Sequence, residues 1–414
     1  MAKGRPEVKI FKFVPLLLCL FLTRPASSHD PVTTSVTFNK EIIRILQRSC
    51  LDCHAPGRIK GDISLATFED ARPWAKAIKE EVLEKRMPPF QAVKGYGNFH
   101  NSYLLSQREI ELLISWIEGG APRGDLKDLP KETVPSSSWS LGTPQLNLQP
   151  EEMIKIPAGN GEYTACVKLP TNLKQAQSAN AIEFLPTNAG MILGAEFFLQ
   201  KQCNGNCAVG EKIGEWVPGQ DAIQFPASSG VNLPANSCLT MKIRYNQGEQ
   251  EMRDHSILGV YLAADEPAMP AQRIAITPTP TSIAAGAKAR IVASYLVRED
   301  VNAIAIRPLL FPFATSVEAT ALRPDGSADI LIVAQEYRHN WQPSYFYKQP
   351  IILPAGTRVD VTAYLDNSDD NRNLQSDPKM LKFAEPLVEL TLVKPKSSTD
   401  KPTSVTSTSI VQKH

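Results

Sequence analysis

The chain has 414 residues, with 44 Lys and Arg against 43 Asp and Glu, so its formal net charge is +1. This balance argues against a nucleic-acid binder, which needs a large cationic surplus or a basic stripe. No apolar run reaches the roughly 18–20 residues of a membrane span. At about 100–200 residues per domain the length predicts two to four domains. The 33 prolines and 23 glycines favour many turns and mostly β structure.

The first 28 residues have the pattern of a secretory signal peptide. Basic residues at positions 3, 5, 9 and 12 precede an apolar run from Phe13 to Leu22. Small residues at 26–28 then offer a cleavage site before His29. An uncleaved anchor would need a longer apolar core. We therefore expect export to the bacterial periplasm or beyond it.

The seven cysteines fall into three groups. Cys19 leaves with the predicted signal, and Cys50 and Cys53 belong to a motif described below. The remaining four, in the second half of the chain, are Cys166, Cys203, Cys207 and Cys238. An even number of cysteines in an oxidising compartment predicts two disulfides. Of the three pairings, Cys203–Cys207 with Cys166–Cys238 is one candidate.

The segment Cys50-Leu51-Asp52-Cys53-His54 matches C-x-x-C-H, the attachment signature of a c-type haem. Two thiols at this spacing reach the two vinyl groups of one porphyrin edge, and the adjacent His54 reaches the iron. A zinc site would need a second ligand pair nearby, and no cysteine follows before Cys166. A thioredoxin-like motif would follow a buried strand, whereas the sequence from Phe38 to Leu46 predicts an amphipathic helix. We expect one covalent haem c.

The sixth iron ligand should lie further along the chain. Met87, in Arg86-Met87-Pro88-Pro89-Phe90, is the one methionine between residues 29 and 128. The paired prolines forbid helix there and stiffen the loop that would hold the thioether against the iron. A Met opposite a His raises the redox potential. His100 is the competitor, and its ligation would give a lower potential.

A second amphipathic helix is predicted from Ser106 to Glu118, ending at Gly119-Gly120. With the haem motif, Arg86-Met87-Pro88-Pro89 and the segment Trp116 to Pro122, residues 33–128 resemble class I cytochrome c domains. The resemblance implies a small all-α fold, one haem ligated by His and Met, and single-electron transfer. It assigns residues 29–128 to this domain.

The chain changes character after residue 128. Residues 129–150 are rich in proline and serine and predict a linker. Short β-type runs follow, at 181–184, 191–199, 239–245, 256–262, 290–297, 329–335, 357–365 and 388–393. Such spacing predicts two β-sandwiches, at 151–270 and 271–395, and the Ser/Thr-rich end at 396–414 predicts disorder. The expected fold class is multidomain: an all-α class I cytochrome c domain followed by an all-β region of two jelly-roll-like β-sandwiches.

Several phrases of the second half resemble the type II copper, ascorbate-dependent monooxygenases of the peptidylglycine and dopamine β-hydroxylating type. The phrases are Trp216 to Gly219, Asp254 to Tyr261, Arg323 to Gly326, Asn340 to Tyr345 and Asp366 to Pro378. The resemblance covers residues 150–393. It implies two jelly-roll-like sandwiches with one copper site in each, facing across a cleft.

The copper ligands of that family do not carry over to this chain. The six matching positions hold residues that do not bind copper: Leu193, Gly194, Arg244, Leu309, Phe311 and Leu390. Only His255 and His339 lie in the β region, and imidazole is the usual copper(II) ligand in such sites. We therefore expect no copper and assign no catalytic residue.

These observations together predict an exported electron-transfer protein with one haem. The β region would be a non-catalytic docking or scaffold module that places the haem near a redox partner protein or a complex, membrane-associated complexes included. We expect no nucleic-acid partner and no transmembrane span in the mature chain. Two alternatives stay open: an active copper monooxygenase fed electrons by the haem, and a structural subunit whose haem is a relic.

Overall fold

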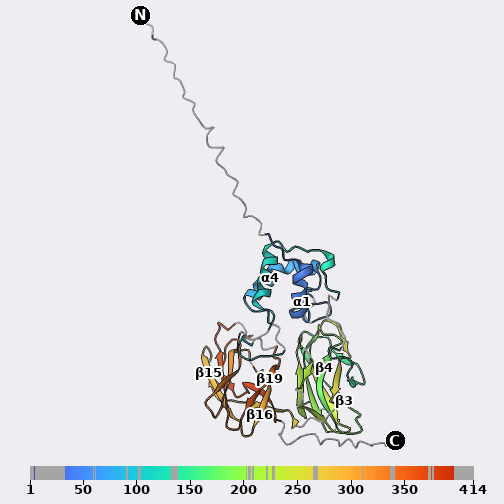
Figure 1. Cartoon of the computed structure of the whole chain (residues 1–414), viewed down its shortest axis with the longest axis vertical. Coiled ribbons are helices and arrows are strands. Elements are labelled where there is room, and N and C mark those ends of the chain that lie inside the picture. Colours follow the sequence, from blue (N-terminus) through green and yellow to red (C-terminus); the bar gives the residue numbers. More distant parts are fainter. Residues whose placement is uncertain are drawn as a thin grey trace, which may run out of the picture.

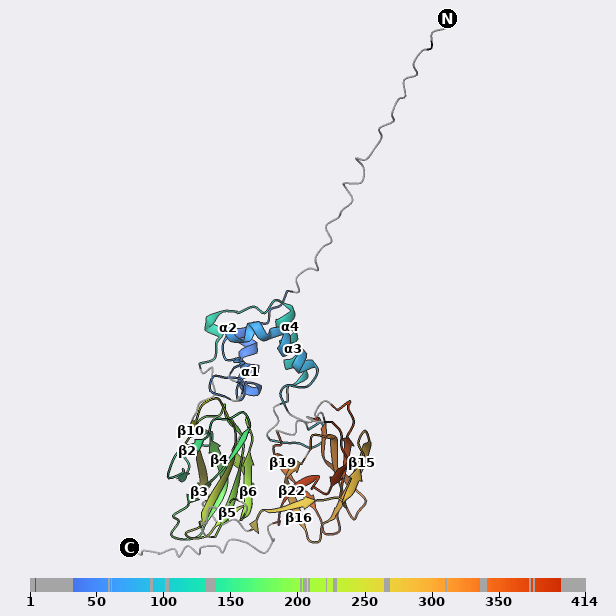
Figure 2. The same ribbon diagram turned by 180° about the vertical axis from the view of Figure 1, so that it is seen from behind.

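The computed structural model of the chain describes Gly4 and residues 33–395. Within that range it leaves out 59, 61, 90–91, 101–103, 132–138, 202, 204–206, 208, 221, 226–228, 264–268, 310, 336–340, 372–373 and 375–376. The predicted signal peptide, except Gly4, and the predicted tail at 396–414 lie outside the described residues. His339 lies outside them too. Figures 1 and 2 show a helical part at one end and two β bodies side by side beneath it.

The helical part, here called the helical module, comprises residues 33–131. Its elements are η1 (Phe38–Ile42), α1 (Ile43–Ser49), α2 (Phe68–Ala71), η2 (Arg72–Trp74), α3 (Ala75–Leu83), α4 (Gln107–Glu118) and η3 (Leu126–Asp128). The two helices predicted at 38–46 and 106–118 are confirmed. Ser106 and Glu109 form a capping box that starts α4, as the sequence of this turn favours. Phe38, Leu46 and Trp116 are fully buried between the helices.

The predicted fold class, with an all-α class I cytochrome c domain at 29–128, is wrong. Of the described residues 42% lie in strands and 13% in helices, and the longest helix among them has 12 residues. Residues 92–100, here called the arm, leave the helical module and pair with the second β body. Ala92 bridges Ala334, Phe99 bridges Tyr347, and both Ala92 and Phe99 are buried in that body's core. The first third of the chain is therefore not a self-contained helical domain, and the fold is nearly all β with several sheets.

The first β body, here called the first sandwich, has two main sheets around one core. One contains β1 (Leu146–Leu148), β11 (Ile257–Leu262), β4 (Gln177–Leu185), β8 (Ser229–Leu233) and β12 (Met269–Pro270), with β7 (Ile223–Gln224) beside β4. The other contains β3 (Glu162–Pro170), β9 (Cys238–Asn246), β5 (Ile192–Gln200) and β6 (Glu211–Trp216). A small pair, β2 (Ile154–Ile156) and β10 (Met252–Asp254), lies apart from both.

The second β body, here called the second sandwich, has two four-stranded main sheets. One contains β13 (Gln272–Ile276), β22 (Val388–Val393), β16 (Val301–Pro308) and β19 (Tyr345–Leu353). The other contains β15 (Lys288–Leu296), β20 (Arg358–Asp366), β17 (Ala314–Leu322) and β18 (Ala328–Gln335), and β14 (Thr281–Ile283) pairs with β21 (Leu381–Phe383). Side chains of alternating positions, such as Val317 and Val361, fill the core between the sheets.

Two disulfides form within the first sandwich, as predicted, but the candidate pairing was wrong. They join Cys166 to Cys207 and Cys203 to Cys238. In the β3–β9 register Cys166 lies opposite Lys242, whereas Cys238 lies opposite Pro170. Four residues along a strand span about 13 Å, and a disulfide needs Cα atoms within about 7 Å. Strand register, which the sequence does not reveal, therefore excludes the expected Cys166–Cys238 bond.

The two sandwiches meet at a buried carboxylate. Glu215 of β6 has only 3% of its side chain exposed, and its Oε2 lies 3.0 Å from Arg273 and 3.3 Å from Lys212. Its Oε1 lies 3.9 Å from Arg307 Nε and accepts a hydrogen bond from the hydroxyl of Ser344. These cations hold the pKa of Glu215 well below its usual range although burial alone would raise it. Arg273, Arg307 and Ser344 belong to the second sandwich, so one ionised carboxylate ties the sandwiches together.

We expect Glu215→Gln to lower the free energy of unfolding by about 3–5 kcal/mol, because it leaves buried cations without their carboxylate. Urea denaturation monitored by fluorescence measures the change. The matched control is Glu162→Gln, which removes an exposed partner of Arg244 and should change stability by less than about 1 kcal/mol. Equal losses in the two variants would contradict the structural role of Glu215.

The Glu215→Gln effect should also depend on pH with a definite sign. Because the folded-state pKa of Glu215 is lowered, its ionisation stabilises the fold fully above the unfolded pKa of about 4.3. That stabilisation is lost as the pH falls through the lower folded-state pKa. Urea midpoints at pH 7 and at decreasing pH should therefore converge for native protein and variant on the acid side. A gap that widens in acid would overturn this assignment.

Candidate functional site

The motif Cys50 to His54 forms a tight turn at the end of α1. The amide of Cys50 donates to Leu46 O at 2.8 Å and closes the helix. The amides of Cys53 and His54 both donate to Cys50 O, at 3.2 and 2.9 Å. Neither Cys50 nor Cys53 forms a disulfide, and each residue taken as a whole is of intermediate exposure. The turn thus presents two free thiols three residues apart with an imidazole next to the second.

The thiols line a small pocket, here called the thiol pocket, where all three parts of the chain meet. It is lined by Ser49, Cys50, Asp52, Cys53, Pro88, Pro89, Pro218, Gly219 and Trp341. Pro218 and Gly219 follow β6 of the first sandwich, and Trp341 precedes β19 of the second. The indole Nε1 of Trp341 donates to Pro218 O at 2.9 Å. The pocket encloses about 20 Å³, which is room for a vinyl-sized group and not for a whole macrocycle.

Gly219 lets the first sandwich approach the thiols closely. It adopts φ +82°, a conformation that favours glycine. A Cβ at this position would lie 3.5 Å from Cys53 Sγ. The sequence singles out the phrase Trp216 to Gly219 and the segment around Trp341, but it does not predict that either of them lies beside the thiols. Their proximity to Cys53 depends on long-range packing, which no local pattern reveals.

Both thiols have raised pKa values because they are buried. Burial raises the pKa of Cys50 to about 12 and that of Cys53 to about 11. Thiol–disulfide exchange and zinc binding both use the thiolate, which a lowered pKa favours. The environment of this pair therefore favours neutral thiols over the redox-active dithiol of a thioredoxin-like motif.

The imidazole of His54 is held in one orientation. Its Nδ1 lies 3.1 Å from the carbonyl oxygen of Ile63, which can only accept a hydrogen bond, so Nδ1 is the donor. Burial lowers the pKa of His54, so the ring is neutral at pH 7. A neutral imidazole protonated at Nδ1 leaves Nε2 with a lone pair, the arrangement of a metal-ligating histidine.

The two candidates for a sixth ligand lie in different places. Met87 follows α3, and its amide donates to Glu81 O at 3.1 Å. The next two residues, Pro88 and Pro89, line the thiol pocket, although Met87 itself does not. His100 is exposed at the end of the arm, and its amide donates to Phe346 O at 2.8 Å. The structure brings the Met87 loop, and not His100, to the thiols.

The six positions matched to copper ligands fall into two groups. Leu193, Gly194 and Arg244 lie on neighbouring strands β5 and β9, where Gly194 is opposite Arg244. The other three belong to the second sandwich. Phe311 stacks on Phe313 at 5.6 Å between ring centroids, and Leu390 is fully buried in β22. Leu309 donates its amide to Leu387 O at 2.9 Å.

The described part of the chain contains no group of three or more His, Cys, Asp and Glu side chains that could hold a metal ion. No family model matches the sequence, and no curated protein matches it. Among solved structures the chain is similar to the major capsid protein P2 of bacteriophage PM2, at 10% identity over 61% of this chain and 98% of that one, with a TM-score of 0.29.

Two further similarities are weaker still. One is the VP2 subviral particle of infectious bursal disease virus, at 9% identity over 60% of this chain and 71% of that one, with a TM-score of 0.19. The other is an F-lectin (fucolectin) from striped bass serum, at 7% identity over 58% of this chain and 84% of that one, with a TM-score of 0.18. Likenesses this weak carry no argument about function.

These findings overturn the two family resemblances. The described residues are nearly all β and form no all-α domain, and the sequence matches no family model, so the chain is identified neither as a class I cytochrome c nor as a copper monooxygenase relative. The prediction of a cytochrome fold built around an iron centre is corrected with them, because the described residues form no all-α domain and no cluster of metal-binding side chains. Haem attachment at Cys50, Cys53 and His54 stays a prediction, since a porphyrin would supply the other iron ligands. The two free thiols and the neighbouring imidazole are a local observation, which does not depend on either family resemblance.

The compartment follows in part from the structure. Two disulfides indicate an oxidising, exported environment. Among the described residues no helix is long and apolar enough to cross a membrane.

The raised thiol pKa values give a direct test. In exported protein without an attached group, we expect iodoacetamide to modify Cys50 and Cys53 at pH 8 at least about tenfold more slowly than in urea-unfolded protein with intact disulfides. The rate in the folded protein should keep rising above pH 9, because the thiolate forms only there. Mass spectrometry of the peptide measures it. Rapid modification at pH 7 in the folded chain would contradict buried, neutral thiols.

Proposed function

We propose that Cys50, Cys53 and His54 bind one haem covalently and that the chain transfers single electrons in an exported compartment, the bacterial periplasm. One observation carries the proposal: two free thiols three residues apart stand beside a neutral imidazole whose Nδ1 is bonded to Ile63 O. The bound group would supply one-electron chemistry between ferric and ferrous iron. The donor types and their spacing fit such a group, because the porphyrin would provide the remaining iron ligands and a protein cluster of three is not needed, whereas the thiol pocket has room only for the attached edge.

The two thiols are suited to addition chemistry. Each S–H would add across one vinyl group, so that sulfur bonds to one carbon and the proton goes to the other, with no oxidant. Thiols that stay neutral resist oxidation to a mutual disulfide, since the thiolate is the species that attacks. The high pKa of Cys50 and Cys53 therefore keeps the pair reduced in a compartment where the four other cysteines described become disulfides.

His54 would hold the iron through Nε2. Its Nδ1–H donates to a backbone carbonyl, which fixes the tautomer and increases the basicity of Nε2. Met87 would hold the iron as the other side-chain ligand, since its loop carries Pro88 and Pro89 to the thiols. His100 remains the alternative.

The β region would act as a docking module for a redox partner protein. Pro218, Gly219 and Trp341 lie against the thiols, so both sandwiches contact the edge at which the group would be attached. A partner that binds the sandwiches near Trp341 would thus stand close to that edge.

The direct experiment is expression of the full chain with its export signal and the haem attachment machinery. We expect one haem per chain, covalently bound and retained on a denaturing gel. The double variant Cys50→Ser with Cys53→Ser should lose all covalent haem, whereas Met153→Leu, at an exposed position, should keep it. Export of a folded, disulfide-bonded chain that takes up no haem would refute the proposal.

The sixth ligand is tested on the same material. Axial ligands set haem potentials over about 0.8 V, and a Met ligand raises the potential. We therefore expect Met87→His to lower the midpoint potential by on the order of 0.1 V, while His100→Gln leaves it unchanged. Spectroelectrochemical titration measures both. A large shift in His100→Gln with none in Met87→His would assign the ligand to His100.

A further inference from the structure

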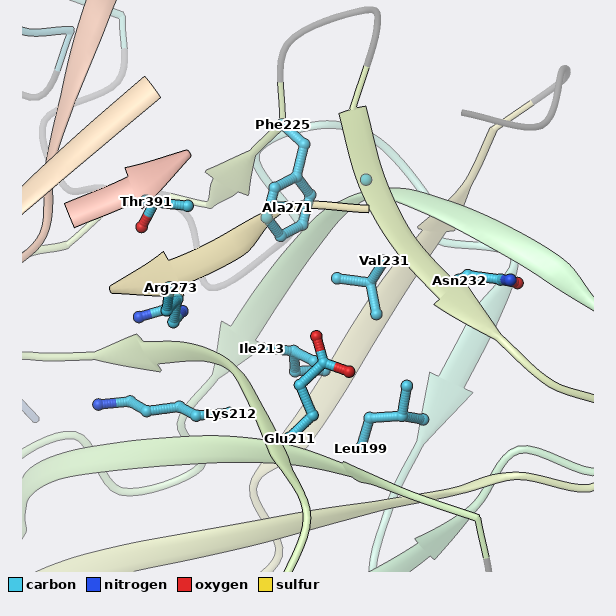
Figure 3. A pocket seen from close by; sticks show the side chains of 11 residues that line it. Leu199, Glu211, Lys212, Ile213, Phe225, Val231, Asn232, Ala271, Arg273 and Thr391 are labelled. Atoms are coloured by element: carbon cyan, nitrogen blue, oxygen red, sulfur yellow. The ribbon is translucent and has the colours of Figure 1, made fainter. Parts of the chain in front are cut away.

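A cavity lined by basic side chains lies at the contact between the sandwiches. It encloses about 290 Å³, and its lining includes Gly194, Glu196, Val217, Lys242, Arg244 and Arg307. We call it the basic cavity. It differs from the small pocket of Figure 3, which encloses about 50 Å³. In that pocket Lys212, Arg273 and Thr391 lie on one side and Val231 and Asn232 on the other.

The side chain of Arg244 lies beside Gly194 of β5, a position that has no side chain. It pairs across the sheet with Gly194, and its NH2 nitrogen would lie 3.7 Å from a Cβ added to that glycine. Its NH1 nitrogen lies 3.3 Å from Glu162, whose side chain is 57% exposed. An exposed ion pair of this kind is weak in water. The absence of a side chain at Gly194 therefore leaves space beneath one edge of a guanidinium group.

The charges around the cavity leave a positive surplus. Four cations, Lys212, Lys242, Arg273 and Arg307, share the three carboxylates of Glu196, Glu215 and Glu389. Their partners hold the pKa values of Glu196 and Glu215 below the usual range, so both are ionised at pH 7. One positive charge is left over before Arg244 is counted.

The wall of the cavity is partly apolar. Val217 lines the cavity beside the cations, whereas Ala195 and Trp216, which also border it, belong to the core of the first sandwich. A small volume, a surplus of about one charge and an apolar wall fit a monoanion with an apolar body better than a phosphate dianion. Arginine recognises a carboxylate through paired N–H donors, which gives this group geometric as well as charge complementarity.

We propose that the basic cavity binds a small organic carboxylate, with its anionic group on Arg244, Lys242 and Arg307 and its apolar body against Val217. This site does not depend on the haem proposal. The two sites share backbone segments, since Trp216 and Val217 run directly into Pro218 and Gly219, and Gln342 follows Trp341. A bound carboxylate would therefore lie beside the chain segments that cover the thiols.

The test uses calorimetric titration of the full exported chain with phenylacetate. We expect binding that weakens at least tenfold in Arg244→Gln and in Lys242→Gln, and at least tenfold weaker binding of the neutral phenylacetamide. Gly194→Val keeps every charge but fills the cavity, and should abolish binding. The matched control is Lys168→Gln, an exposed cation on β3 outside the cavity, which should bind within twofold of the native chain. Thermal unfolding of each variant establishes that it is folded.

Three outcomes would overturn the proposal. The first is the absence of phenylacetate binding by the native chain. The second is equal binding of phenylacetate and phenylacetamide, or native affinity in folded Gly194→Val, either of which would place binding elsewhere. The third is tighter binding of phenyl phosphate than of phenylacetate, which would assign the cavity to phosphate ligands. Running the titration on the Cys50→Ser, Cys53→Ser variant separates this result from the haem proposal, because carboxylate binding should persist there.

Discussion

The buried carboxylate of Glu215 determines how the two halves of the β region meet. Taking an ion out of water is unfavourable by several kcal/mol unless partners surround it. Here the partners come from both sandwiches, with Lys212 on the same strand and Arg273, Arg307 and Ser344 across the contact. Hydrophobic burial would tolerate several relative positions of the sandwiches, whereas this set of charges is satisfied in one. The basic cavity and the thiol pocket are both formed by segments whose positions follow from that contact.

The sequence was informative wherever structure is local. The helices around Ile45 and Leu113, the capping box at Ser106 and the tight turn that presents Cys50 and Cys53 all depend on residues within a few positions of one another. Each of the eight β-type runs in the second half also coincides with a strand and extends at most one residue beyond it. Alternating burial, as in β17, produces a pattern that a sequence shows directly.

Long-range packing was not predictable in the same way. The sequence predicts that the arm belongs to a helical domain. In the structure, Phe99 of the arm instead packs against Tyr345 and Tyr347 of the second sandwich, at 5.3 and 5.2 Å between ring centroids. The disulfide partners followed from strand register, and the contact of Gly219 with Cys53 followed from the docking of a whole sandwich. The family resemblances failed for a related reason: short phrases share local turn chemistry, which many unrelated folds use.

The arm has a consequence for the order in which the protein assembles. Ala92 and Phe99 belong to the core of a sandwich whose last strand ends at Val393. The segment made first thus completes its packing only after nearly the whole chain has emerged. Until then Pro218 and Trp341 cannot cover Cys50 and Cys53, and the turn that carries them is open. The thiols are therefore accessible to chemical modification before the final strands of the nascent chain dock, and they are covered afterwards.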